Sequence, residues 1–442
     1  MGVSEPSVDQ AVAEWLRDNT NRLRTLDPAD EDFSDLEPLR EIVGDARVVC
    51  IGESTHRVHE FYQIRHRVTR FLVTRLGFGG FVMESGFPEG LAVNEWVLGG
   101  GGDLNALLHN GINYHMGKCA EMREQLEWMR AYNASSDREV RFYGMDVPDS
   151  SASAVPSVRA VLSLLDDVDP AYAKVVRTSL LPLFDYLPTD RSGRAWAAPA
   201  LQAYMGLEAT VRHRLTALIA DLVERLQAMR IVYSGLADAD RVDRIFRCAA
   251  TGRHMDAFLS AMAAGASRTY PGANIRDAAM AENVEWILRR EDRIVIGAAN
   301  GHVQRWPFWA PPIVNDKLTM VGEHLAASLG DQLVVIATCF GGGELMLHRP
   351  IPDGPPGHTE LFVQDAGPFS QDTLDGLLST AGVPLHLLDL RGIPDTGPVA
   401  DRFARTTSMM NGGQPQPIDP RAAFDAVVYI DTVTPWHRFP TA

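Results

Sequence analysis

The sequence predicts an α/β protein with a mostly parallel central sheet, flanked by helices and carrying a long helical insertion. Short runs rich in Val, Ile or aromatic residues recur along the chain, and helical patterns lie between several of them. Strands of a parallel sheet are buried on both faces and therefore read as short apolar runs. Their alternation with helical patterns is typical of a sheet covered by helices.

The strand-like and helical segments give a domain organisation. The expected strands are 47–51, 79–84, 140–146, 293–298, 332–338 and 425–431. The expected helices are 8–24, 58–76, 119–133 and 278–290, and 199–234 reads as one long amphipathic helix. The Gly-rich stretches 99–102 and 341–343 read as loops, because no phosphate-binding motif surrounds them. We therefore expect residues 1–150 and 271–442 to form the two parts of an α/β catalytic domain, capped by a helical insertion at 151–270.

Composition limits the classes of function. The 442-residue chain is long enough for a sizeable core, and its formal net charge of −16 argues against a nucleic-acid surface. The four cysteines are scattered without metal-ligand spacing, so we expect buried reduced thiols. We find neither a signal-peptide pattern nor a long apolar run, and we expect a cytoplasmic protein without a membrane partner. The oligomeric state is not readable from the sequence.

The most informative motif is Gly52-Glu-Ser-Thr-His56, directly after the apolar run 47–51. In open α/β sheets, ligands bind at the carboxyl ends of the strands. A carboxylate and an imidazole three residues apart in such a loop can form an oriented general base. Polar residues follow other expected strands in the same way: Glu84, Asp146, Asn300 and His302, with Arg65 on the helix after the first loop. This set suits proton transfer, with Arg65 steadying developing charge.

Other interpretations of these residues are possible. Two histidines and nearby carboxylates could ligate a metal, but no compact H-x-x-x-H motif is present, and we expect no metal and no cofactor. Ser54 could be a nucleophile, but no G-x-S-x-G elbow surrounds it. Asp146 or Glu84 could simply cap a following helix.

Several ordered motifs resemble the erythromycin esterase family. They are Gly52–Glu60, Phe81-Val-Met-Glu84, Trp128–Asn133, Arg141–Asp146, Asn274–Ile287, Asn300-Gly-His302, Gly322–Gly330 and Phe424–Asp431. The resemblance covers nearly the whole chain and is weakest from 150 to 270. It implies a metal-independent hydrolase that opens a macrolide lactone with water. It also implies His56 as general base, with Glu53, Arg65, Glu84 and His302 completing the catalytic site. The residues that we expect to contact a bulky natural-product substrate are Arg57, His59, Glu60, His115, Asp146, Arg276 and Asn300.

One departure from the family pattern bears on the reaction. The family usually shows Ala-His-Asn-x-His where this chain reads Ala298-Ala-Asn-Gly-His302, so Ala299 replaces a histidine. Losing an imidazole removes a donor or proton carrier. The leading hypothesis is an ester or lactone hydrolase. The second is a natural-product tailoring enzyme (cyclase, lyase or dehydratase) that uses the same proton-transfer site, and the third is a binder that sequesters a ligand.

Overall fold

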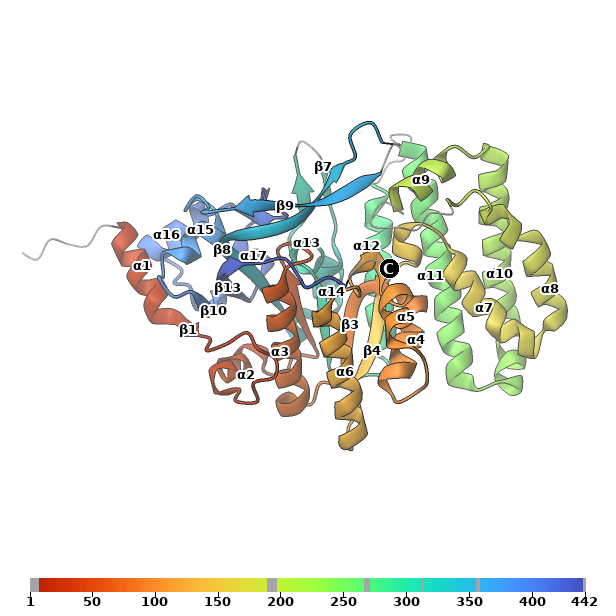
Figure 1. The fold of residues 1–442 in the computed structure, drawn as a ribbon, viewed down its shortest axis with the longest axis horizontal. Coiled ribbons are helices and arrows are strands. Elements are labelled where there is room, and N and C mark those ends of the chain that lie inside the picture. The colour runs from red at the N-terminus through yellow and green to blue at the C-terminus, as the bar shows by residue number, and fades with distance from the viewer. Residues whose placement is uncertain (1–7, 189–196, 266–270, 312–313, 355–357, 440–442) are drawn as a thin grey trace, which may run out of the picture.

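The computed structural model describes residues 8–188, 197–265, 271–311, 314–354 and 358–439 and has a mixed α/β architecture (Figure 1). Six strands run parallel to one another at the centre of the main sheet: β2 Val48–Glu53, β3 Gly80–Gly86, β4 Arg141–Asp146, β5 Ile294–Ala299, β8 Leu333–Pro350 and β13 Ala426–Val433. The strand order is β1-β10-β13-β8-β2-β5-β3-β4. The predicted mostly parallel sheet is confirmed, and each of the six expected strands is present.

Antiparallel strands extend this sheet. They are β1 Thr20–Arg22, β9 Thr359–Ala366, which pairs with the long β8, and β10 Leu385–Asp389, which pairs with β13. Two small hairpins lie outside it: β6 Phe308–Ala310 with β7 Val314–Leu318, and β11 Ser408–Asn411 with β12 Gln414–Pro417. The expectation of a loop at 341–343 is wrong, because these glycines lie inside β8.

Helices cover both faces of the sheet, and each face has its own hydrophobic core. Successive residues of a strand belong to the two cores in turn. Val49 and Ile51 of β2 belong to a core under α3 and α6, whereas Val48 and Cys50 belong to a core under α12 and α14. This division follows from the two-residue repeat of a strand. The helices are α1 Val8–Asn19, α2 Pro38–Val43, α3 His59–Leu76, α4 Phe87–Val97, α5 Leu104–Asn110, α6 Ala120–Ser135, α12 Ala273–Ile287, α13 Asn300–Val303, α14 Val321–Leu329, α15 Leu374–Ser379, α16 Pro398–Arg405 and α17 Pro420–Ala423.

The described residues between 151 and 265 form helices that pack to one side of the sheet (Figure 1). They are α7 Val155–Val168, α8 Pro170–Ser179, α9 Ala197–Met205, α10 Ala209–Leu236 and α11 Ala239–Ala264. Their apolar faces meet in a hydrophobic cluster centred on residues such as Leu165, Leu222 and Met255. The expectation of one continuous helix over 199–234 is wrong, because Gly206 to Glu208 separate α9 from α10.

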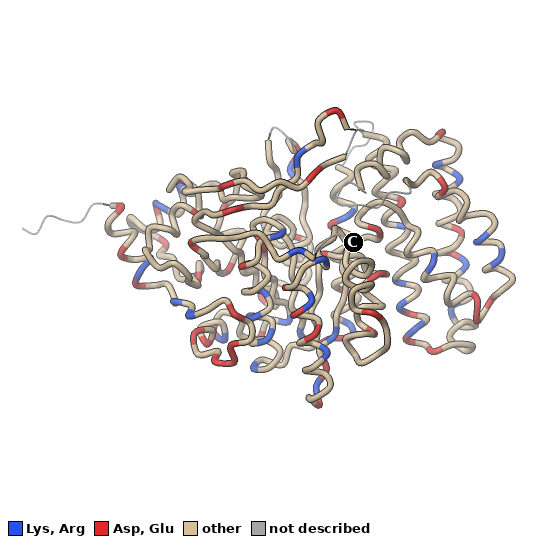
Figure 2. Tube along the Cα trace, in the orientation of Figure 1, with Lys and Arg blue, Asp and Glu red and all other residues tan. Residues whose placement is uncertain are grey.

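Charge is spread over the whole molecule. Acidic and basic residues are interspersed along the trace in Figure 2. None of the described helices is long and apolar enough to cross a membrane. All four cysteines are buried free thiols, as predicted.

Candidate active site

Four of the sheet's parallel strands bring polar groups to one edge of the sheet. Glu53 is the last residue of β2, and it lies opposite Ala299, the last residue of β5. Asp146 ends β4, and Glu84 lies near the end of β3, where the pairing with β4 is irregular. Because parallel strands end at a common edge, residues far apart in sequence converge there. Helix α13 begins directly after Ala299 and adds His302 to this edge.

The first cluster at this edge is built around the Glu53 carboxylate. Its Oε1 lies 2.5 Å from Nδ1 of His56, and its Oε2 accepts a 3.0 Å hydrogen bond from Nη1 of Arg65. The Glu53 and Arg65 side chains are only 4% and 3% exposed, whereas His56 is 29% exposed. Arg65 also lies over the ring of Tyr62, at 4.3 Å. The buried ion pair therefore fixes Glu53, and Glu53 fixes the accessible imidazole.

Close backbone packing holds the loop that carries His56. A Cβ on Gly52 would lie 2.0 Å from Oδ1 of Asn300, so β2 can approach α13 this closely only with glycine at this position. The amide of Asn300 is itself bonded to both backbone groups of Thr338 on β8. Ser54 donates its hydroxyl to the Met410 carbonyl at 2.7 Å and is buried, so this hydroxyl helps to anchor the loop.

The second cluster is an ion-pair network around Arg276 of α12. Its guanidinium binds Asp146 through Nε at 3.0 Å and Nη2 at 2.6 Å, and Nη2 also binds Glu84 Oε1 at 3.1 Å. The other oxygen of Glu84 accepts the Ala299 backbone N–H at 3.0 Å. Neither carboxylate serves as the simple helix cap that was considered from the sequence. Both are held by the same arginine.

His302 joins this network between two carboxylates. Its Nδ1 lies 2.7 Å from Asp277 Oδ1, and its Nε2 lies 3.3 Å from Glu84 Oε1. Burial alone would lower the pKa of His302, but the charges of Asp277 and Glu84 raise it to about 10. Burial would raise the pKa of Glu84, but His302, His56 and Arg276 outweigh it and hold the pKa well below its ordinary value. His302 is therefore an imidazolium at neutral pH. Because the charges of His56 and His302 both act on Glu84, the two clusters adjoin.

Two polar residues of this network were not among the predicted site residues. Asp277 follows Arg276 directly on α12, and Tyr114 donates its hydroxyl to Asp146 at 3.0 Å. Tyr114 has a φ of 53°, a left-handed conformation that non-glycine residues rarely adopt. Such residues are often found at functional sites. The sequence signal for Asp277 was its place beside Arg276, while the strain at Tyr114 has no sequence signature.

The remaining predicted contact residues lie around the first loop. Arg57, with a φ of 69°, stacks over the Trp436 ring at 5.9 Å. Burial, and then the cations Lys118, Arg438 and Arg57, lower the pKa of His115 to about 4. His59 and Glu60 begin α3 and contact Glu121 and the C-terminal segment rather than either cluster. The substrate contacts expected for these residues and for Asn300 stay predictions.

Comparison with known proteins decides the family. The erythromycin esterase family model matches residues 73–433, which is most of the chain. The chain belongs to the erythromycin esterase family. Among curated relatives, erythromycin esterase type II of Escherichia coli is 26% identical over 393 residues, covering 86% of this chain and 89% of that protein. Erythromycin esterase type I of Escherichia coli is 24% identical over 385 residues, covering 84% and 88%.

Solved structures share the fold. A Bacillus cereus protein superposes with a TM-score of 0.79 at 20% identity, covering 98% of this chain and all 100% of its own. A mutant erythromycin esterase in its open conformation gives 0.76 at 19% identity, covering 94% and 98%. Membership of the erythromycin esterase family indicates an enzyme with a hydrolase-like function and a small-molecule substrate. The matched segment begins after Glu53, His56 and Arg65, so the family match bears on the second cluster more directly than on the first.

Proposed function

We propose that this esterase-family enzyme hydrolyses an ester or lactone of a bulky natural product with water activated by His56. The observation that carries the proposal is the Glu53–His56 pair at 2.5 Å, because it orients an accessible imidazole through a buried, ion-paired carboxylate. With Nδ1 directed at Glu53, Nε2 of His56 is the nitrogen left to accept a proton. The charge of Glu53 stabilises the imidazolium that forms.

The reaction follows from these positions. His56 removes a proton from water as the water oxygen attacks the carbonyl carbon, and the carbonyl oxygen becomes an oxyanion. The positively charged His302, held through Nδ1 by Asp277, stabilises that oxyanion by its charge. His56 then returns its proton to the leaving alkoxide as the acyl–oxygen bond breaks. The products are a carboxylic acid and an alcohol, which stay in one molecule when the substrate is a lactone.

The proposal gives Arg65 a different role from the one expected from the resemblance. The sequence pattern predicts that Arg65 steadies the charge that develops in the reaction. In the structure the Arg65 side chain is 3% exposed and bonded to Glu53. We therefore propose that Arg65 positions Glu53 and that His302 stabilises the oxyanion.

A second candidate function rests on Ala299. Its backbone N–H binds Glu84, so a methyl group stands beside the ion-pair network where the family pattern has an imidazole. A site with fewer hydrophilic groups favours reactions that exclude water. An intramolecular cyclase, lyase or dehydratase that uses His56 as its base is therefore the alternative.

The experiment that separates these functions is mass spectrometry of products formed in ¹⁸O-labelled water. The purified protein is incubated with a panel of macrolides and other lactones. Hydrolysis adds one labelled oxygen, and this is the expected result. An isobaric product or loss of water from the substrate would instead support the cyclase, lyase or dehydratase. Absence of turnover across the panel would count against macrolide hydrolysis.

A further inference from the structure

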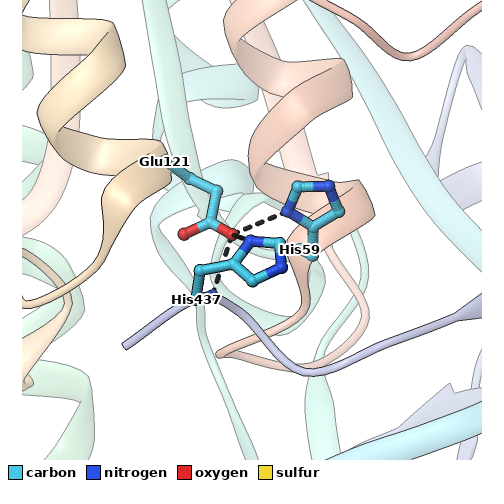
Figure 3. Close-up of side chains that lie close together, drawn as sticks. All are labelled: His59, Glu121 and His437. Atoms are coloured by element: carbon cyan, nitrogen blue, oxygen red, sulfur yellow. Dashed lines mark hydrogen bonds and ion pairs between the residues drawn. The ribbon is translucent and has the colours of Figure 1, made fainter. Parts of the chain in front are cut away.

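A cluster of two histidines and one glutamate lies at the start of α3, outside both catalytic clusters. Oε1 of Glu121 is 2.6 Å from Nδ1 of His59 and 2.8 Å from Nδ1 of His437, and it also accepts the His437 backbone N–H at 2.9 Å. Figure 3 shows both rings directed at the same carboxylate. The three side-chain atoms all lie within 4.8 Å of one another.

The electrostatic surroundings of this cluster favour a cation. The Glu121 side chain is only 2% exposed, whereas His59 is 28% and His437 is 68% exposed. A buried carboxylate needs a positive partner, and Glu60 and Glu124 add further negative charge close to His59. His59 and Glu121 both lie in the first turns of helices, whose dipoles disfavour a cation. The surrounding carboxylates offset that effect.

We propose that His59, Glu121 and His437 form a binding site for a divalent transition-metal ion, with Zn²⁺ as the best fit. Imidazole nitrogen and carboxylate oxygen are common zinc ligands, and three protein ligands leave a position for water. With metal–ligand bonds of about 2.0–2.1 Å, tetrahedral ligand atoms lie about 3.3 Å apart. The present separations of 2.6 and 2.8 Å therefore have to widen by less than about 1 Å. The exposed His437 ring has room to make most of that movement.

A metal at this position would hold the C-terminal segment, residues 434–437, next to the loop that carries His56. Thr434 of that segment binds the Glu60 carboxylate through its backbone N–H and its hydroxyl, each at 2.7 Å. The backbone N–H of Trp436 donates to the carbonyl of Arg57, the residue after His56. The ion would join α3, α6 and this segment. Its ligands are far apart in the sequence, because Glu121 lies 62 positions from His59 and 316 positions from His437. Because of that separation, no compact sequence motif marks the site. The proposed metal site also differs from the expectation, made from the sequence, that the chain binds no metal.

The test is calorimetric titration of the full-length, metal-stripped, tag-free protein with Zn²⁺ at neutral pH. We expect one Zn²⁺ per chain and a Tm that rises with Zn²⁺ concentration, because an ion that binds only the folded state stabilises it. His437→Ala is expected to weaken Zn²⁺ binding at least about tenfold and to abolish the Tm shift. Lower pH is expected to weaken binding, since protons compete for the imidazoles.

A matched control is the substitution His213→Ala, which removes an exposed histidine of α10 far along the chain from the cluster. It is expected to bind Zn²⁺ as the unsubstituted protein does. Glu121→Gln, checked for folding by circular dichroism, is expected to bind as weakly as His437→Ala. The proposal is overturned if the unsubstituted protein binds no Zn²⁺ stoichiometrically, or if His437→Ala binds it with unchanged affinity. Either result would mean that the three residues of the cluster only hydrogen-bond to one another.

Discussion

Glu53 divides its two carboxylate oxygens between a histidine and an arginine. Taken alone, the contact between Glu53 and Arg65 is an ordinary buried ion pair. Taken alone, the contact between Glu53 and His56 is an ordinary hydrogen bond near the surface. Together they hold an accessible imidazole against a charge that cannot move away. This is the arrangement of a general base with a fixed orienting group.

Substitution of Glu53 by Gln tests whether that charge matters. The amide keeps the shape of the carboxylate but cannot stabilise an imidazolium at His56. We expect kcat to fall by about 10²–10⁴-fold with a smaller effect on KM. The measurement is steady-state turnover of whichever lactone the panel identifies. Glu41→Gln, at an exposed position of α2, is the matched control and should retain turnover. Unchanged kcat in Glu53→Gln would remove Glu53 from the mechanism.

The charge on His302 predicts a pH dependence of stability. Its pKa of about 10 lies above the ordinary value of 6.5, so protonation favours the folded state. The contribution is fully present below about pH 6.5 and is lost as the pH rises through about 10. The difference in unfolding free energy between the unsubstituted protein and His302→Gln should therefore shrink over this interval. Urea denaturation at several pH values measures it, and a constant difference would contradict the assignment.

At the scale of the elements, the site depends on how closely β2 approaches α13. Gly52→Ala would place a methyl group 2.0 Å from the Asn300 side chain, which is itself held by Thr338. We expect a loss of about 1–3 kcal/mol in unfolding free energy from this overpacking. Gly101→Ala is the matched control, because nothing lies within 4 Å of its added Cβ. Urea denaturation curves compare the two, and equal stability in both variants would show that β2 and α13 can separate without cost.

The elements differ in how well their sequences predict them. Parallel strands such as β2 and β5 are buried on both faces, so their apolar runs show clearly. Antiparallel β9 has only half-buried and exposed residues, and β10 is a five-residue strand behind a proline, so neither shows such a run. The break between α9 and α10 was missed because a single glycine within a Leu- and Ala-rich pattern is compatible with a continuous helix.

Part of the site can be predicted from the sequence for the same reason. Residues directly after apolar strands, such as Glu53 and Asp146, can be placed at a common sheet edge from sequence alone. Asp277 could not, because its position on α12 relative to His302 depends on how that helix packs. Nor could the pairing of Glu84 with Arg276, which joins residues 192 positions apart.

Over the whole molecule, the helical region has a hydrophobic core of its own beside the two cores of the sheet. The helices between 151 and 265 pack around their own cluster, with α12 linking it to the site through Ala279. We retain the prediction that this region is an insertion within the α/β domain. Among the motifs quoted from the sequence, none falls between 151 and 270, and we propose that this region contributes the substrate specificity.

The most direct test of the central claim is turnover in ¹⁸O-labelled water by the unsubstituted protein and by His56→Ala. The account predicts a product carrying one labelled oxygen from the unsubstituted protein, and a rate about 10²–10⁴-fold lower from His56→Ala with folding unchanged by circular dichroism. His302→Gln should also slow the reaction, because the positive charge that stabilises the oxyanion is then lost. A labelled product formed by His56→Ala at the unsubstituted rate would contradict the account.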